Sequence, residues 1–550
     1  MKKRLVSLLS LVLVIVMVLA MAISCGKEET PNDNKTPSDS NNGTTQKPDE
    51  GNKPDPIVPV EKNWYDDVDF GGQTLTIQLS GANDPELPVV KEYIKGPDVQ
   101  TSGDTGTEKV QNEVYLRNRT VMGKSGLNLD VQYRFVEGKE SLWGSVGPYI
   151  VNAERNYASS DKIDMYCDML YDMMGAACEK GVFDNILNYT TANGGYFNIS
   201  RINGYNVALM EDMSLTSDRQ ALIASDYYLD VLRAMTILPF NLEMYTNYAN
   251  PNDKDAKGLY QMALDGEWTW DKLMSFDNVA SSSGATSIND DRILIPLACG
   301  GLTASALLYS TAYDMYEVTG DGYYKLLTTC TPLWQLFEKA GDLAIHHGVT
   351  VIQRQTGEEE TATVERANAK FTSGGSLFAT VNMLGILETN DFQNMGAGKL
   401  SIMPVPKLND GSEYSTMINS RARVGALSYN STNQLAMSAF IQLSTEKSEG
   451  VKQKYFDVAM NGKYLAGSGA GDVLTMVYNN LGNTKGAILD NLVLYRNWSI
   501  GRENCWTQLI KGDGFRKYAT SIQSQYASSI QAKQTVLDDA VDAWMDCARG

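Results

Sequence analysis

From residue 64 onward, the hydrophobic and polar positions of the chain alternate between two periods. Three segments have the pattern of strands, and two have apolar residues at helical spacing. The strands are expected at residues 75–79, 128–135 and 163–170, and the helices at residues 107–124 and 147–160. Strands separated by helices of this length imply right-handed crossovers. The pattern therefore predicts an α/β fold in which a mainly parallel sheet is wrapped by helices on both faces.

Polar and aromatic side chains follow two of these strands. Asn83 comes just after the first strand, and Asp168 and Tyr171 lie at the end of the third. Ligands of open α/β sheets bind outside the carboxyl ends of the strands. We therefore expect these three residues to contribute to a ligand-binding site.

The start of the chain has the layout of an export signal. Lys2, Lys3 and Arg4 precede an uncharged stretch over residues 5–24, and Cys25 follows. The apolar residue, two small positions and cysteine at its end resemble the lipobox of bacterial lipoproteins. That resemblance implies that residues 1–24 are a lipoprotein signal peptide and that Cys25 carries lipid, including palmitate. A membrane-spanning helix is the alternative, because this uncharged stretch is long enough to cross a bilayer.

The next region, residues 25–63, is expected to be the lipidated cysteine and a disordered tether. Residues 26–62 are rich in Asn, Asp, Thr, Ser, Lys and Pro, and they contain six of the 16 prolines of the chain. Such a composition cannot bury a core and remains extended and solvated. The body would then stand at the outer face of the cell membrane, attached through Cys25.

Length and charge narrow the classes of protein further. A chain of 550 residues exceeds what one hydrophobic core supports, so at least two lobes are expected. The formal net charge is -19, and it becomes -22 once a signal with three basic and no acidic residues is removed. We do not expect the protein to bind nucleic acid, because neutralising phosphates needs clustered Lys and Arg, and this acidic composition lacks them.

Four segments carry a family resemblance. They are DGEWTWDKL at residues 265–273, FTSGGSLF at 371–378, GKLSIMPVPK at 398–407, and an apolar helical pattern over 521–544. In this order, they resemble the extracellular solute-binding proteins of ABC sugar importers. Residues 269–273 also have the physical signature of a capped helix start with tryptophan packed against it.

The resemblance implies a two-lobe, periplasmic-binding-protein-like fold of type II, with lobes joined by hinge strands. The crossings are expected at residues 219–225 and 423–429. The expected division is lobe 1 at 64–222, lobe 2 at 223–424, a return to lobe 1 at 425–480, and C-terminal helices at 481–550 that belong mainly to lobe 2.

The same resemblance implies the partners and further site residues. The protein would be a monomer without cofactor or metal that captures a carbohydrate and delivers it to ABC permease subunits. Sugars need aromatic faces and hydrogen-bonding side chains, so the candidates at the hinge and in the second lobe are Tyr227, Tyr228, Trp270, Asn382 and Trp498. Tyr227 and Tyr228 are neighbours in an expected strand, so at most one should face the ligand. Trp270 lies at a helix start, where packing is the commoner role.

Two other functions stay open. The chain has two histidines, adjacent at 346 and 347, and no GxSxG segment, so a serine or cysteine triad has little support. A lipid-anchored extracellular glycoside hydrolase remains possible, because two carboxylates suffice for that chemistry. The same fold could instead bind a peptide or another solute. The six cysteines after Cys25 could be paired or free.

Replacing the lipidation residue separates anchor from body. Cys25→Ala should release the protein from the membrane and leave ligand affinity unchanged, because the binding lobes begin only near residue 64. Membrane fractionation and a binding assay measure the two effects. Firm attachment of the variant would show that the apolar stretch spans the membrane.

Overall fold

The computed structural model describes most of the chain from residue 63 onward. The described residues are 63–80, 90–123, 125–136, 144–158, 162–277, 295–299, 306, 316–327, 350–351, 361–379, 381–396, 398–497 and 520–548. Among them, no helix combines the length and apolar character that crossing a bilayer requires. The expected signal, tether and lipid attachment lie outside these residues, as do Asn83 and Trp498.

The first lobe is built on a four-stranded sheet with the order β12-β3-β1-β2. Its strands are β1 (Gln73–Ser80), β2 (Leu129–Val136), β3 (Met165–Met169) and β12 (Arg423–Leu427). β1 runs parallel to β2 and β3, whereas β12 is antiparallel to β3. The first three strands confirm the expectations from periodicity. The fourth comes from a segment more than 250 residues later in the chain.

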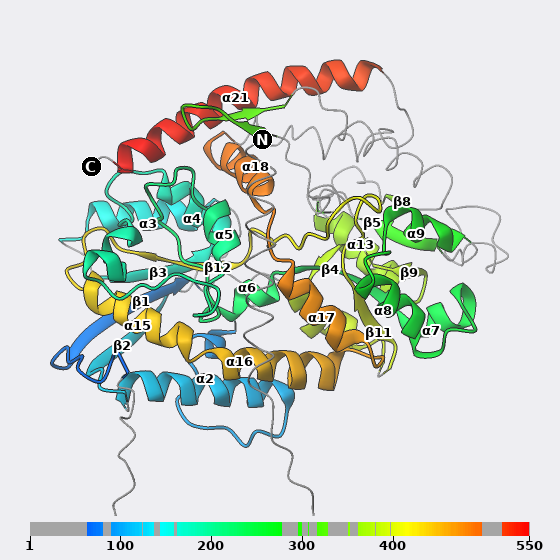
Figure 1. The fold of residues 1–550 in the computed structure, drawn as a ribbon, viewed down its shortest axis with the longest axis horizontal. Helices are drawn as coiled ribbons and strands as arrows, with labels where there is room; N and C mark the ends of the chain where they lie inside the picture. Colours follow the sequence, from blue (N-terminus) through cyan, green and yellow to red (C-terminus); the bar gives the residue numbers. More distant parts are fainter. Residues whose placement is uncertain are drawn as a thin grey trace, which may run out of the picture. The chain divides into compact units, whose positions relative to one another are not determined.

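Helices cover this sheet (Figure 1). They include α2 (Gly106–Gly123), α3 (Val146–Arg155), α4 (Leu170–Ala177), α5 (Val207–Asp212), α15 (Gln434–Glu446), α16 (Glu449–Gln453) and the π-helical segment η8 (Lys454–Tyr464). At the start of α2, the Oγ1 of Thr105 accepts from the Glu108 N–H at 3.1 Å, and Glu108 accepts from the Thr105 N–H at 2.9 Å. This reciprocal cap fixes where the helix begins.

The second lobe contains a mixed sheet with the order β10-β4-β9-β5-β8, in which β11 also pairs with β4. Its strands are β4 (Thr236–Asn241), β5 (Ile295–Cys299), β8 (Thr350–Val351), β9 (Ser376–Phe378), β10 (Asn382–Met383) and β11 (Leu400–Met403). β5 is parallel to β8 and β9, but β4 is antiparallel to three neighbours. The two-lobe α/β prediction is confirmed, and the mainly parallel character holds for the first sheet alone.

The helices of the second lobe are mostly short. They are α7 (Leu242–Met244), α8 (Lys257–Leu264), α9 (Trp270–Met274), α13 (Thr361–Thr372), α14 (Asn390–Gln393) and, much later in the chain, α17 (Ala470–Asn479). α13 packs on β5 and β9, and α17 packs on β11 and α8. These helices therefore come from segments between the strands of this sheet and after its last strand.

Two of the segments that carry the family resemblance bind each other. The indole N–H of Trp268 donates to the carbonyl of Pro404 at 2.9 Å, and that of Trp270 donates to Pro406 at 3.0 Å. The Trp270 backbone N–H also donates to the Lys407 carbonyl at 2.9 Å. Both rings are at most 1% exposed. The two motifs thus pack against each other inside lobe 2, and we call this buried contact the tryptophan lock. The expected helix cap is also present, because the Thr269 Oγ1 accepts from the Lys272 N–H.

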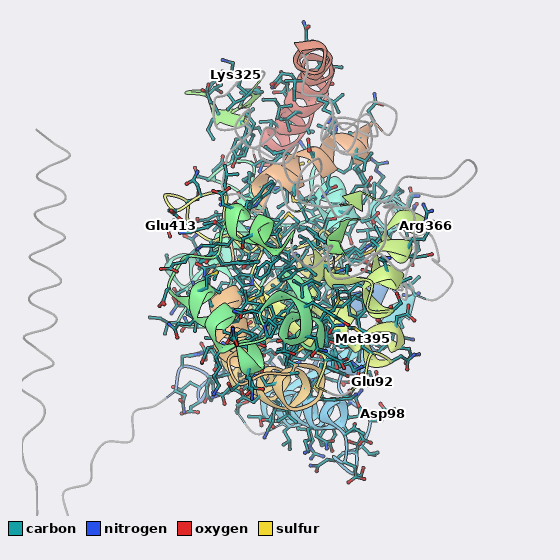
Figure 2. The ribbon with its side chains drawn as sticks, turned by 90° about the vertical axis from the view of Figure 1, so that its right-hand side faces the viewer. Glu92, Asp98, Lys325, Arg366, Met395 and Glu413 are labelled. Atoms are coloured by element: carbon teal, nitrogen blue, oxygen red, sulfur yellow. The ribbon has the colours of Figure 1, made fainter. Side chains whose placement is uncertain are left out.

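The C-terminal helices lie on lobe 1, whereas we expected residues 481–550 mainly on lobe 2. α18 (Lys485–Arg496) packs on α4 and α5, and α21 (Thr520–Ala548) packs on α18. α21 also contacts a hairpin of β6 (Tyr316–Val318) and β7 (Tyr324–Leu326), which Figure 2 shows beside α21 at Lys325. The apolar pattern over residues 521–544 predicted that one face of this helix is buried, but it did not predict which lobe the helix packs against.

The tryptophan lock predicts a graded loss of stability. Trp270→Phe keeps an apolar ring but leaves the Pro406 carbonyl without its donor, so unfolding should become easier by about 1–3 kcal/mol. Trp270→Ala also opens a cavity and should cost about 3–5 kcal/mol. Urea unfolding measures both, with Tyr248→Phe as an exposed aromatic control. Equal losses for Phe and Ala would contradict the role of the indole N–H.

Candidate functional site

A buried cluster of charges lies where the chain passes between the lobes. The first crossing leads into the helix α6 (Leu229–Arg233), which carries Asp230 and Arg233. Asp230 Oδ1 lies 2.7 Å from Arg233 Nη1, and its Oδ2 lies 2.6 Å from Nη1 of Arg423 on β12. The three side chains are at most 6% exposed. The carboxylate of Asp230, which follows the first crossing, therefore binds Arg423, the first residue of β12 in the second crossing.

The cluster extends into the second lobe through Glu388. Arg233 donates from Nε and Nη2 to the two oxygens of Glu388, each at 3.1 Å. Glu388 belongs to η7 (Leu384–Glu388), which follows β10, and it also accepts from the Tyr455 hydroxyl at 2.7 Å. The Arg233 guanidinium lies 5.2 Å from the ring centroid of Tyr93 in lobe 1. Groups from both lobes thus surround one arginine.

Burial and charge oppose each other in this cluster. Burial alone would raise the pKa of Asp230, but Arg423 and Arg233 outweigh it and lower that pKa below its usual value. Burial would lower the pKa of Arg233, but Glu388 and Asp230 raise it well above its usual value. Burial would also lower the pKa of Arg423, but Asp230 raises it above its usual value. Asp230, Arg233 and Arg423 are therefore held in their charged forms.

The two expected crossings run side by side. Within the expected bounds, Ile223 exchanges backbone hydrogen bonds of 2.7 and 3.0 Å with Gly425. The pairing continues outside those bounds, where Thr236 N–H donates to the Met417 carbonyl and Asn419 N–H to the Ala234 carbonyl, both at 3.0 Å. The segment at 219–225 makes isolated bridges and is not a strand, in contrast to our expectation, whereas 423–427 is β12 as expected.

A third link between the lobes lies beside the second crossing. α17 of lobe 2 is connected to α18 of lobe 1 by the short segment 480–484. Within it, Asn480 accepts from the Thr416 N–H at 2.8 Å, and Gly482 donates to the Thr416 carbonyl at 3.1 Å. The expected division placed a change of lobe at this point but in the opposite sense, with residues 425–480 in lobe 1 and 481–550 mainly in lobe 2. In the structure, α17 packs on β11 and α8, and α18 packs on α4.

Asp168 and Tyr171 are brought together at the carboxyl end of β3, next to the second crossing. The backbone N–H of Leu170 donates to Ala422 at 2.8 Å, and that of Tyr171 donates to Ser420 at 3.0 Å. Asp168 is 2% exposed and Tyr171 is 4% exposed. The strand-end rule therefore placed both residues at the junction of lobe 1 with the crossing.

The neighbouring Asp172 has a structural task that the sequence did not reveal. It is fully buried, and burial raises its pKa to about 6 although its carboxylate accepts from the Gly147 N–H. This hydrogen bond, 2.8 Å long, holds the first turn of α3. The ring of Tyr495 from α18 fills the space above Gly147 and Gly175, where a Cβ atom would meet it at 2.3 and 2.2 Å. The available signal was the position of Asp172 just after the third expected strand; its partner Gly147 lies 25 residues earlier in the chain.

Tyr227 and Tyr228 lie in the core of lobe 1, and our expectation that they face opposite sides of a strand is wrong. They lie at the start of α6, and their rings are 4.9 Å apart at 76°. The Tyr227 hydroxyl lies 3.1 Å from that of Tyr133, and the Arg117 guanidinium lies 4.6 Å from the Tyr227 ring centroid. A turn brings neighbouring side chains together where a strand would separate them. Both rings are therefore packing residues in this conformation.

The candidates of the second lobe are not adjacent in one described site. Trp270 belongs to the buried lock described above. Asn382 lies on β10, is 5% exposed, and donates from Nδ2 to Oδ1 of Asn368 at 3.1 Å. Among the described residues, no group of His, Cys, Asp and Glu side chains is arranged to hold a metal ion.

Comparisons with known proteins find solved structures that are similar to this one at low sequence identity. No protein-family model matches the chain, and none of the curated proteins matches it. A cyclic α-maltosyl-1,6-maltose binding protein from Arthrobacter globiformis is similar with a TM-score of 0.49 and 12% identity, over 84% of this chain and 98% of that one. The GacH receptor of Streptomyces glaucescens, solved unliganded and with acarbose, gives 0.46 and 12%, over 85% and 99%. An ABC transporter solute-binding protein from Thermotoga lettingae, bound with α-D-tagatose, gives 0.43 and 13%, over 84% and 100%.

The charge cluster predicts a strong dependence on Asp230. Asp230→Asn leaves Arg233 and Arg423 without their shared carboxylate, which should cost about 3–5 kcal/mol of unfolding free energy. Because the pKa of Asp230 is lowered in the folded protein, its contribution is present above about pH 4 and is lost as the pH falls through the folded pKa.

Denaturant unfolding at pH 7 and at pH 3 measures both effects, with Asp130→Asn on exposed β2 as the matched control. The gap between wild type and Asp230→Asn should narrow at pH 3. A loss below 1 kcal/mol at pH 7 would contradict the role of the cluster.

Proposed function

We propose that this protein captures a small solute of the carbohydrate class between its two lobes and delivers it to an ABC importer. The observation that carries this proposal is the pair of α/β lobes joined by adjacent crossing segments around a buried charge cluster. Lobes connected in this way can rotate about the crossings, and a ligand that contacts both lobes favours the closed arrangement. A permease can then distinguish loaded from empty protein by the position of the lobes.

The solute site is proposed at the carboxyl end of the first sheet. Asp168 and Tyr171 supply a carboxylate and an aromatic ring there, and Tyr171 already contacts the Tyr495 ring edge-on at 5.6 Å. Asn83 and Trp498 are the further candidates from the flanking segments, and Asn382 is the candidate from the second lobe. Carboxylates and amides suit sugar hydroxyls, and aromatic rings suit the apolar sugar face.

Binding is favoured over hydrolysis by the state of the carboxylates near this site. A glycoside hydrolase needs one carboxyl group free to donate a proton and a second free to act as base or nucleophile. Asp172 is committed to the N–H of Gly147, and Asp168 accepts from the Met169 N–H at 2.8 Å. Both are buried. This arrangement supports a non-enzymatic role.

The proposed location is the outer face of the cell membrane. The basic start, the uncharged stretch and Cys25 support export and lipid attachment, and the proline-rich segment supports a tether. The acidic body would gain no attraction from anionic lipid, so the anchor must hold it there. We propose a monomer, with ABC permease subunits and the membrane as its partners.

A ligand screen on residues 26–550 tests the function. Mono- and oligosaccharides should include one that binds saturably, raises the melting temperature and is recovered unchanged. Small-angle scattering should show compaction with that sugar, because the lobes close on it. Release of sugar products would support a hydrolase and overturn the proposal. Tight binding without compaction would contradict closure of the lobes.

Matched variants locate the site within the same assay. Asp168→Asn should weaken the identified sugar at least about tenfold, which corresponds to about 1.4 kcal/mol. Asp130→Asn, on the exposed face of β2, should leave the affinity unchanged. Unchanged affinity in the Asp168 variant would place the solute elsewhere.

A further inference from the structure

Two free cysteines lie where the C-terminal helix meets lobe 1. Cys178 is the residue that ends α4, and it is buried. Cys547 lies in the last turn of α21 and is half-buried. α21 is docked on lobe 1 near this point, because the indole N–H of Trp544 donates to the Thr216 hydroxyl at 3.1 Å. The cysteines are 369 positions apart in sequence, but both of their helices pack on α18.

One arginine contacts the neighbours of both cysteines. Nη1 of Arg219 donates to the carbonyl of Ala177 at 2.9 Å, and Ala177 directly precedes Cys178. The same guanidinium lies 4.3 Å from the ring centroid of Trp544. Cys547 follows Trp544 by three positions on α21, so the two side chains share one helix face. The guanidinium therefore lies between the two elements that carry the thiols.

The electrostatics of the three groups agree with this placement. Burial raises the pKa of Cys178 to about 12, Arg219 opposes that rise, and the Cys547 sulfur adds to it. Burial lowers the pKa of Arg219, and the largest opposing influences are Cys547 and then Cys178. Burial also raises the pKa of Cys547, again opposed by Arg219. These influences agree with the position of Arg219 between the two elements, which its contacts with Ala177 and Trp544 establish.

We propose that Cys178 and Cys547 are a redox pair that closes to a disulfide and staples α21 to lobe 1. The pairing in the cell rests on the proposed export, because disulfides persist in extracytoplasmic compartments. The oxidant is an external disulfide, such as glutathione disulfide or a disulfide-bearing oxidoreductase. The overall change converts two thiols and one external disulfide into one protein disulfide and two external thiols.

The half-buried Cys547 reacts first. Its thiolate attacks the external disulfide, which forms a mixed disulfide and expels one thiolate that takes up a proton. Cys178 then loses its proton, and its sulfur attacks the Cys547 sulfur and expels the second external thiolate. Arg219 stabilises the negative charge on each sulfur in turn. Because burial makes both thiolates scarce, closure of the folded protein is slow and is faster while the chain folds.

Oxidation and peptide mapping test the pair directly. Reduced residues 26–550 are treated with glutathione disulfide, both folded and during refolding, then denatured, alkylated and digested. Mass spectrometry should find one peptide pair joined through Cys178 and Cys547, whereas Cys167, buried in β3, should be recovered alkylated. Cys547→Ser should give no joined pair. This readout does not depend on sugar binding, so its failure and that of the proposed function are separate.

A second readout follows stability. Closing so long a loop restricts the unfolded chain, so the oxidised wild type should melt several degrees above the reduced form, and Cys547→Ser should show no such difference. The proposal is overturned if Cys178 and Cys547 are recovered as alkylated thiols or as separate glutathione adducts after both treatments. It is equally overturned if Cys178 is found joined to another cysteine.

Discussion

The carboxylate of Asp230 is the group on which the relation between the two lobes depends. It is buried at the end of the first crossing, and it is shared by Arg233 and by Arg423 of the second. Arg233 in turn holds Glu388 of lobe 2. Separating any of these charges in a dry environment is expensive, so the proposed lobe motion would have to leave the cluster intact. The cluster would then be a fixed point, and the backbone of the crossings around it would absorb the rotation.

The spacing of apolar residues along the chain predicted those elements whose position depends on nearby residues alone. β1, β2, β3 and α2 lie where periodicity placed them, because one buried face per element is enough to specify them. The mixed order of the second sheet depends on pairings between distant segments, which no local period encodes. The same limit applies to α21: its apolar face was recognised, but its contact with α18 and with the β6–β7 hairpin follows from tertiary packing.

The positions of the candidate site residues in the fold were likewise predicted correctly in some cases and wrongly in others. Asp168 and Tyr171 reach the junction with the crossing because the end of a parallel strand is a position that topology fixes. Tyr227 and Tyr228 do not reach this junction. The strand expected there is a turn, and the two side chains pack against each other. Trp268 and Trp270 carry much of the family resemblance, yet they bond to Pro404 and Pro406 inside lobe 2. The tryptophans that carry the resemblance thus pack the interior of lobe 2, and they do not indicate which ligand is bound.

The position of β12 in the first sheet has a consequence for the order in which the protein is assembled. β3 is completed by residue 169, but the strand that covers its open edge spans Arg423–Leu427. The sheet of lobe 2 uses residues between 236 and 403, so all its strands are available earlier than this partner. A chain that emerges from its N-terminus must keep the β3 edge unpaired while the whole second sheet is made. An unpaired edge invites wrong partners, so the first sheet needs protection during synthesis that the second sheet does not.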